Sequence, residues 1–333
     1  MEADVIVDRR RMRRRLSFWR VVAFAAIAAA ALFAITAFSG GEGLFEAHRP
    51  QIARVSVTGV ILTDRKRVEM LKKIGKSDAV KAVILSLDTP GGTTTGGEEL
   101  YKALRELAEK KPLVATVNTM AASAGYMAAI SAERIFARQT SITGSIGVIF
   151  QFAEVTKLAE TIGVDVEAIR SGKLKAQPSP FEPASEESRS LIKEIVADSY
   201  TWFVDLVAER RGVSADDIRA AEGRIFTGAQ GLKAGLVDEI GGEDEAVAWL
   251  ETEKGIEEDL PVRDWKPEPI IESLSFGDAA LAFIADRFGI SGQFARLRVA
   301  EKLISDKLLL DGLLSVWHAP AIAARDNLEG ADR

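Results

Sequence analysis

The stretch that decides the fold is Val117-Asn118-Thr119-Met120-Ala121-Ala122-Ser123-Ala124-Gly125-Tyr126-Met127. An apolar run at 112–117 predicts a strand that leads into it, and small residues crowd around its one serine. This pattern is typical of a hydroxyl at a tight strand-to-helix junction, where small neighbours let a substrate carbonyl approach closely. Ser123 is therefore a candidate nucleophile, and its hydroxyl needs a neighbouring base to take its proton.

The base is predicted to be a lysine. Histidine is the usual base, but the chain has only His48, just beyond a hydrophobic N-terminal segment, and His318, near the C-terminus. The segment Ser171-Gly172-Lys173-Leu174-Lys175-Ala176 follows a predicted strand at 164–169 and offers two lysines. A free lysine has a pKa near roughly 10.4, which burial against apolar groups can lower by about 3–5 units. Either lysine could then accept the serine proton; a pair of ordinary surface lysines is the alternative.

A third element is Asp88-Thr89-Pro90-Gly91-Gly92, which follows an apolar run at 79–87. We expect a strand to end here in a turn, with paired glycines that let backbone N–H groups point at a ligand. Two such donors near a reacting carbonyl form an oxyanion hole. The alternative is an ordinary Pro-Gly turn.

Composition narrows the function classes. The 333 residues allow one large or two modest domains with a buried core. The absence of cysteine excludes disulfides, thiolate catalysis and cysteine-ligated metals. The net charge is −6, yet the first 20 residues hold seven arginines and three acidic residues, so the remaining chain is acidic. An acidic body argues against a nucleic-acid binder.

A membrane segment is predicted next to the basic N-terminus. The run from Val21 to Phe38 is uncharged, and residues 18–40 are just long enough to span a bilayer as a helix. The upstream arginines keep residues 1–17 in the cytoplasm by the positive-inside bias, so the body lies across the membrane. A cleaved secretory signal, with Ala37-Phe38-Ser39 as its site, is one alternative. A buried core helix is another.

Strand and helix patterns alternate along the body, which predicts a mostly parallel sheet with crossover helices. The expected strands are 51–61, 79–87, 112–117, 134–137, 148–150 and 164–169, and the expected helices are 69–74, 98–110, 155–162, 185–211, a short one from Thr227 to Gly235, and 243–254. A turn-rich segment is expected at 140–145. The predicted domain spans 41–254, and 255–333 is predicted to be a C-terminal helical extension of unknown role.

These motifs, in this order behind an N-terminal anchor, resemble the bacterial signal peptide peptidase A family in its short, single-domain form. The resemblance runs from about Ile52 to Gly242 and also includes Thr143-Gly144-Ser145-Ile146-Gly147 and Gly235-Leu236-Val237-Asp238-Glu239-Ile240-Gly241. It implies an α/β fold of the caseinolytic-protease (ClpP)/crotonase-like group.

The resemblance also implies site residues. The family's Ser/Lys dyad falls on Ser123 as nucleophile and Lys175 as general base, with Lys173 as the competitor, and Ser145 would orient the lysine. Gly92 and Ala124 would supply the backbone N–H groups of the oxyanion hole. The family usually has serine at the place of Thr89 and glycine at that of Ala124, a small change that keeps the N–H.

The implied function is a serine endopeptidase that cleaves signal peptides left in the membrane after protein export, without metal or cofactor. Its implied partners are peptide substrates, membrane lipid and copies of itself, in a ring or octamer whose active sites are shared between subunits. The implied location is the plasma (inner) membrane, with the catalytic domain on the periplasmic side. The rival hypotheses are a catalytically inactive membrane scaffold on the same fold and crotonase-like acyl-thioester chemistry.

Overall fold

The computed structural model describes residues 18–26, residues 49–267 and the backbone of 314–316. Residues 18–26 form a helix in one unit, and the described residues from Gln51 onward belong to a second unit. Among these described residues, none of the helices combines the length and the apolar character that crossing a membrane requires. Of the span predicted at 18–40, residues 27–40 lie outside the described part of the chain, as does most of the predicted extension at 255–333.

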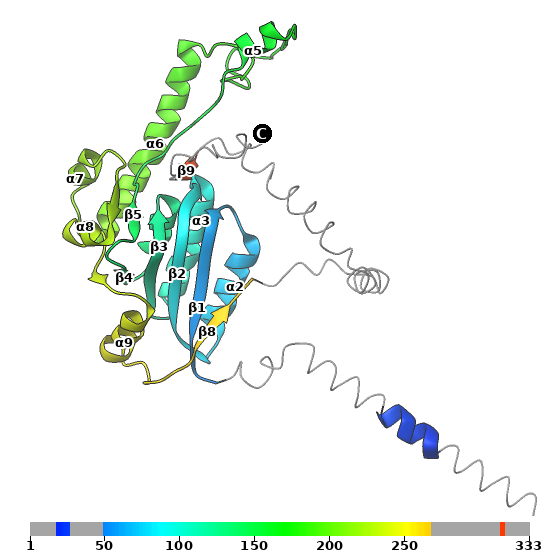
Figure 1. Ribbon diagram of the computed structural model, residues 1–333, viewed down its shortest axis with the longest axis vertical. Helices are drawn as coiled ribbons and strands as arrows, with labels where there is room; N and C mark the ends of the chain where they lie inside the picture. Colours follow the sequence, from blue (N-terminus) through cyan, green and yellow to red (C-terminus); the bar gives the residue numbers. More distant parts are fainter. Residues whose placement is uncertain (1–17, 27–48, 268–313, 317–333) are drawn as a thin grey trace, which may run out of the picture. The chain divides into compact units, whose positions relative to one another are not determined.

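The second unit is a mixed α/β domain (Figure 1). Its N-terminal half contains β1 (Gln51–Ile61), α2 (Arg65–Lys76), β2 (Val80–Thr93), α3 (Thr94–Ala108), β3 (Leu113–Ala122), α4 (Ala124–Ala129), β4 (Arg134–Ala137) and β5 (Ile142–Gly144). The chain continues through α5 (Thr156–Thr161), α6 (Glu186–Arg211), α7 (Ala215–Ala220), β6 (Ile225–Thr227), α8 (Gly228–Lys233), β7 (Glu239–Ile240), α9 (Glu243–Lys254), β8 (Val262–Trp265) and β9 (Leu314–Val316).

The described strands form one sheet with the order β6-β5-β3-β2-β1-β8. Figure 1 shows β3, β2, β1 and β8 side by side. Strand β4 pairs with the first half of β3 and β5 with its second half, so they follow each other along one edge of β3. The pairs are parallel except β5 with β6 and β2 with β9. The prediction of a mostly parallel sheet with crossover helices is thus confirmed.

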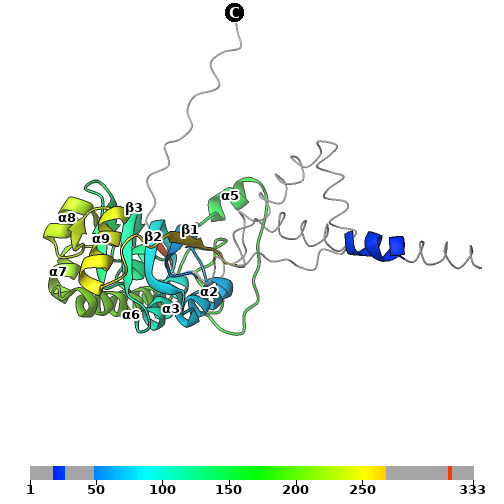
Figure 2. The same ribbon diagram turned by 90° about the horizontal axis from the view of Figure 1, so that it is seen from below.

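Both faces of the sheet are covered, which explains why its central strands are apolar along their length. One face packs against α2, α3, α4 and α6, with buried residues that include Leu71, Leu104 and Phe203. The other face, which includes Ile52 and Ile84, packs against α9. Figure 2 shows α2, α3 and α6 along one side of the strands.

Several predicted elements match closely. Strands β1 and β4 and helix α9 have the expected bounds, and α6 begins one residue after its predicted start, because Ser185 caps it by accepting the Ser188 N–H at 3.1 Å. The helix after Ser123 is α4. Helix α8 begins at the capping box of Thr227 and Gln230 that the sequence indicated.

The prediction of a turn at Asp88–Gly92 was wrong. Strand β2 continues through these residues to Thr93, because Gly91 and Gly92 stay paired with Val60 and Ile61 of β1. The proline and glycines therefore shape an irregular strand, with Gly91 at φ 107°. The expected turn at 140–145 contains β5 instead.

The strands expected at 148–150 and 164–169 were also wrong. Ile149 forms only an isolated bridge, and residues 164–169 have no regular structure. The sequence predicted a strand at 164–169, but Val164, Val166 and Ile169 are exposed, Ile169 to 97%. Within the described residues, the segment 164–169 therefore pairs with no strand of the sheet.

Candidate active site

Ser123 occupies the single residue between strand β3 and helix α4. Its backbone has φ 57° and ψ −118°, a conformation that costs a residue with a side chain of the order of 1–3 kcal/mol. Such a sharp strand-to-helix turn is how many hydrolases present a nucleophilic serine. The Ser123 N–H donates to the Gly144 carbonyl at 2.8 Å, which fixes the turn to β5. The side chain is buried, at 1% exposure.

The small residues around Ser123 serve packing within the chain. A Cβ atom on Gly125 would lie 2.7 Å from Cγ2 of Thr89, and one on Gly97 of α3 would lie 2.9 Å from Cβ of Ala124. Helix α4 therefore approaches β2 and α3 too closely for larger side chains. From the sequence, we interpreted these small residues as giving access to substrate. In the structure they also allow α4 to pack closely against β2 and α3.

Ser145 lies beside Ser123. Ala122 of β3 pairs with Gly144 of β5, so the two serines are the next residues on neighbouring strands. Ser145 also has a positive φ, 51°, and its N–H donates to the Arg224 carbonyl at 3.0 Å. Ser145 is half-buried. The structure thus brings together two of the predicted site residues, in positions that the spacing of 22 residues did not reveal.

Gly92 lies on β2, in the segment that extends beyond the pairing with β3. That pairing ends at Thr89 and Ala121, while β1 holds the opposite edge through Ile61 and Gly92. A Cβ atom at Gly92 would lie 1.8 Å from the Ile61 carbonyl oxygen, so this position has no room for a side chain. The chain packs tightly here, and only the Gly92 backbone is available for contact.

Strand β3 does not pair with Gly91–Thr93, the last residues of β2, and β9 occupies that edge instead. Residues 314–316 pair with it in the antiparallel direction, with Ser315 opposite Gly92. Since β1 already holds the other edge, β9 takes the place of β3 beside the last residues of β2. This edge can therefore accept an extended peptide as an added strand. The predicted amphipathic helical extension did not anticipate this strand.

The hydroxyl of Thr89 holds the glycine segment in shape. Its Oγ1 donates to the Gly59 carbonyl at 2.6 Å and accepts the Gly91 N–H at 3.1 Å. A residue with a hydroxyl group therefore suits position 89. The sequence analysis noted Thr89 only as a difference from the family and gave it no role.

Ala124 supplies the other predicted backbone donor. It is the first residue of α4, so its N–H has no acceptor within the helix.

Lys175 lies in a different place. Residues 171–176 are exposed in a turn closed by the Lys175 N–H and the Gly172 carbonyl at 3.1 Å. Within the described part of the chain, the Lys175 side chain makes no hydrogen bond or ion pair, and Lys173 is exposed as well. The structure of one chain therefore brings Ser123, Ser145, Gly92 and Ala124 to one region but does not bring Lys175 to them.

Lys175 belongs to a segment that we call the arm, residues 151–184. The arm contains α5 and lies near the N-terminal end of α6, which extends beyond the sheet (Figure 1). It is tied to itself by the Val155 N–H bond to the Pro180 carbonyl (2.7 Å) and the Arg170–Glu182 ion pair (2.5 Å). Its exposed large apolar side chains are Phe152, Leu158, Ile162, Val164, Val166, Ile169, Leu174 and Phe181.

A groove of about 690 Å³ begins directly after Ser145. One wall is formed by residues 146–150 and the other by α6 side chains, including Ile192, Val196 and Tyr200. The buried side chains of α6 are concentrated at its C-terminal half, so its N-terminal half faces this groove with little cover. The groove is lined largely by apolar residues.

An α/β domain that holds a serine in a strained strand-to-helix turn has the arrangement in which many serine hydrolases present their nucleophile. Residues 105–257 match peptidase family S49. The chain is 36% identical over 247 residues to slr0021 of Synechocystis sp., which carries a protease assignment; the match covers 73% of this chain and 89% of that protein. The chain belongs to peptidase family S49 and is a serine peptidase.

Other relatives agree. The protein of Enterococcus faecium assigned as signal peptide peptidase SppA is 34% identical, over 62% of this chain and 65% of that protein. Protease 4 of Haemophilus influenzae is 30% identical, over 66% of this chain and 37% of that protein. Among solved structures, a membrane-bound stomatin-specific protease matches 66% of this chain and 99% of its own, with 14% identity and a TM-score of 0.44. The match to family S49 and the similarity to these named peptidases confirm the family predicted from the motifs.

Proposed function

We propose that this serine peptidase is a membrane-anchored endopeptidase with a Ser123/Lys175 dyad, and that it cleaves signal peptides left in the membrane after export. The observation that carries the proposal is the position of Ser123, held in a strained turn between the Gly91–Thr93 edge and Ser145. Other membrane-associated peptides with the same extended form would also be substrates. Relatives named as signal peptide peptidase support this substrate class.

In the proposed reaction, neutral Lys175 takes the proton from the Ser123 hydroxyl, and Oγ attacks the scissile carbonyl. The N–H groups of Gly92 and Ala124 stabilise the oxyanion, a contribution of about 10²–10³ in rate for each donor where it has been measured. Protonated Lys175 gives its proton to the leaving amine, and an acyl-enzyme remains. Lys175 then activates a water that hydrolyses the ester and returns the proton to Ser123.

The substrate is proposed to bind as an extended strand along Gly91–Thr93. Strand β9 supports this mode, because it uses the same edge in the antiparallel direction. Main-chain hydrogen bonds then hold the peptide with little dependence on its side chains. Such binding suits a peptidase that handles many different signal peptides.

The dyad is proposed to be completed by a second copy of the chain. In one chain, Lys175 is exposed and carries no acidic partner within the described residues, whereas a general base must lie within hydrogen-bond reach of its proton donor. The exposed apolar side chains of the arm indicate that a further surface covers it. An arm that docks on the next copy would both bury these side chains and desolvate Lys175.

The groove beside Ser145 is the proposed docking place. If Ser145 orients the lysine, the arm of the neighbour must arrive on the Ser145 side, and the groove begins at the next residue, Ile146. A contact between two different surfaces of the same chain is head-to-tail, and it closes into a ring when the rotation allows. We therefore propose a ring, such as an octamer, whose active sites are shared between neighbouring copies.

The proposed location is the plasma (inner) membrane, anchored by residues 18–40, with the arginine-rich residues 1–17 in the cytoplasm and the peptidase domain in the periplasm. The uncharged run from Val21 to Phe38 supports this anchor. Extraction of cell membranes with alkaline carbonate would leave an anchored protein in the pellet. A protein released into the supernatant would contradict the anchor.

The dyad is tested by single substitutions in the full chain. Ser123→Ala and Lys175→Ala are each expected to abolish hydrolysis of a fluorogenic apolar peptide. Lys173→Ala is the matched control, because it removes another exposed lysine two residues away, and it should keep activity. Full activity of Ser123→Ala would disprove the nucleophile, and absence of labelling of wild-type Ser123 by a fluorophosphonate would favour the inactive scaffold.

The shared site is tested by mixing. If Ser123 and Lys175 meet between copies, co-assembly of equal amounts of Ser123→Ala and Lys175→Ala chains joins an intact serine to an intact lysine at about a quarter of the interfaces of a head-to-tail ring. Activity should return to that level. A mixture that co-assembles and stays inactive would show that both groups act within one chain.

A further inference from the structure

The motif Gly235–Gly241 was singled out in the sequence without a role, and in the structure it lies behind the nucleophile. Tyr126 of α4, three residues after Ser123, is fully buried, and its hydroxyl donates to the Leu236 carbonyl at 2.9 Å. Burial raises the pKa of Tyr126 far above its usual value, so this hydroxyl stays protonated and remains a donor. Helix α4 is thus bonded to the first half of the motif.

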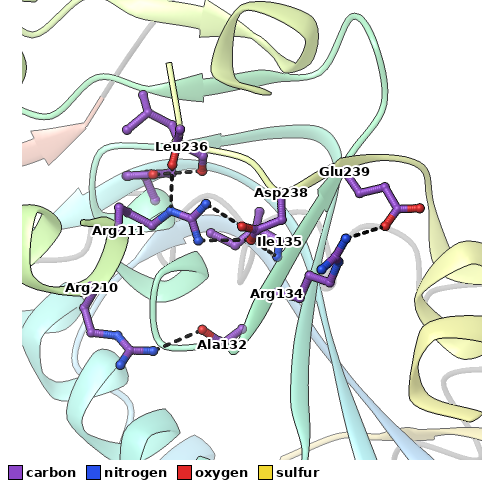
Figure 3. Close-up of polar contacts among 10 residues, drawn as sticks. Ala132, Arg134, Ile135, Arg210, Arg211, Leu236, Asp238 and Glu239 are labelled. Atoms are coloured by element: carbon purple, nitrogen blue, oxygen red, sulfur yellow. Dashed lines mark hydrogen bonds and ion pairs between the residues drawn. The ribbon is translucent and has the colours of Figure 1, made fainter. Parts of the chain in front are cut away.

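The motif itself is held by Arg211, the last residue of α6. The two Nη atoms of Arg211 donate to both carboxylate oxygens of Asp238, at 3.0 and 2.8 Å (Figure 3). Its Nε donates to the Gly235 carbonyl at 3.0 Å. The Arg211 side chain is only 9% exposed. Such a two-pronged pair fixes direction as well as distance.

Asp238 connects this pair to the sheet. Its Oδ2 also accepts the N–H of Ile135 on β4 at 2.8 Å, and its own N–H donates to the Ile135 carbonyl at 2.9 Å (Figure 3). The carboxylate therefore receives three donors from two different elements. The segment from Gly235 to Asp238 is held between the end of α6 and the edge of β4, and Tyr126 is bonded to the carbonyl of Leu236 within it.

Arginine side chains also bind the backbone carbonyls at the C-terminal end of α4 and just beyond it. Nε of Arg210, the neighbour of Arg211, donates to the Ile130 carbonyl at 2.9 Å, and its Nη2 donates to the Ala132 carbonyl at 3.2 Å. Arg105 of α3 donates to the Ser131 carbonyl at 2.9 Å. Cationic donors at the last carbonyls stabilise a helix end. This matters for α4, whose six residues are too few for a helix to be stable alone.

A strained backbone persists only where its surroundings determine it more strongly than the strain opposes it. Ser123 has a φ of 57°, and α4 is its continuation. On one side α4 is fixed by the close contacts of Gly125 with Thr89 and of Ala124 with Gly97. On the other side the polar group of Tyr126, Arg211 and Asp238 prevents α4 from turning away and relaxing Ser123.

We propose that Tyr126, Arg211 and Asp238 are positioning residues, which hold α4 so that Ser123 keeps the conformation that attacks the substrate. None of the three touches the substrate in this proposal, and their effect passes through α4. The inference rests on the proposed role of Ser123 as nucleophile. It predicts that loss of the group lowers the rate of the chemical step more than it lowers substrate binding.

The test compares Tyr126→Phe and Asp238→Asn with a matched control in the full chain. Glu243→Gln is the control, because it breaks another two-pronged pair, in which Arg54 donates to Glu243 at 2.7 and 2.9 Å, away from α4. Tyr126→Phe removes a single oxygen atom and keeps the ring, so it is the variant whose folding is least at risk. For each variant we would measure kcat, KM, the melting temperature and the rate of Ser123 labelling by a fluorophosphonate.

We expect Tyr126→Phe to lower kcat and the labelling rate by about tenfold, the rate equivalent of one lost buried hydrogen bond, with KM unchanged. Asp238→Asn should do the same or more, and the double variant should lose less than the product of the two losses, because the residues act as one group. Glu243→Gln should lower the melting temperature and leave kcat and labelling unchanged.

The positioning role is overturned if Tyr126→Phe keeps the wild-type labelling rate and kcat while its melting temperature falls as in Glu243→Gln. In that case the group only stabilises the fold. This outcome differs from a failure of the proposed function, in which wild-type Ser123 itself would not be labelled. Equal losses of kcat in Glu243→Gln and Tyr126→Phe would also overturn the inference, since the effect would not be specific to α4.

Discussion

Ser123 and Ser145 occupy corresponding positions on two neighbouring parallel strands, each directly after the last paired residue of its strand. Both have a positive φ, 57° and 51°, and the Ser123 N–H is bonded to the residue before Ser145. Two strained serines at the same end of adjacent strands form one polar site at the carboxyl edge of the sheet. Ligands bind at this edge in many α/β proteins.

Ser145→Ala tests the second serine. If Ser145 orients Lys175 by accepting its hydrogen bond, the substitution should lower kcat by about tenfold with little change in KM, since one hydrogen bond to a reacting group is lost. The measurement is steady-state hydrolysis of a peptide, with Ser171→Ala, an exposed serine of the arm, as control. Wild-type kcat in Ser145→Ala would remove Ser145 from the site.

Thr89→Val and Thr89→Ser separate the hydroxyl of Thr89 from its methyl group. Valine loses the bonds to the Gly59 carbonyl and the Gly91 N–H, so we expect the free energy of unfolding to fall by about 1–3 kcal/mol. Because the Gly91–Gly92 backbone then loses its support, kcat should fall as well. Serine keeps the hydroxyl and should keep kcat. Denaturant unfolding and peptide hydrolysis check both effects, and equal activity of the two variants would contradict this role.

Strand β9 and an extended substrate cannot use the edge at Gly91–Thr93 together. A chain that ends at residue 313 should therefore bind peptides better, with a KM several-fold lower than that of a chain that ends at residue 316 and keeps β9. The comparison of these two truncations cancels the loss of residues 317–333. An unchanged KM would indicate that β9 does not compete with substrate.

The raised pKa of Tyr126 predicts a dependence of stability on alkaline pH. Burial is the main cause, so the folded protein keeps this phenol neutral at a pH where the unfolded chain, with a tyrosine pKa near about 10, releases the proton. The contribution of Tyr126 to stability is complete below that pH and is lost as pH rises toward the folded pKa. Urea unfolding between pH 9 and 11 should show a shallower decline in Tyr126→Phe than in wild type. Equal slopes would contradict the burial effect.

The sequence predicted an element accurately where neighbouring residues alone determine that element. Helix α9 and strand β1 were predicted with their observed bounds, because periodicity and caps are set by neighbouring residues. The segment at 164–169 has the alternation of a strand but no strand partner in the chain, and its apolar side chains are exposed. The Pro-Gly segment was predicted as a turn because the sequence cannot show that β1 continues alongside it.

The sequence by itself determined the family, the candidate serine and lysine, and the alternation of strands and helices, because motifs and periodicity are local properties of the chain. Only the tertiary structure decided that Ser145 lies beside Ser123, that Tyr126 bonds α4 to the segment held by Arg211 and Asp238, and that Lys175 is exposed away from the buried Ser123. These relations join residues 22 to more than 100 positions apart, and pairing between distant segments is fixed by packing and strand register, which local patterns do not contain.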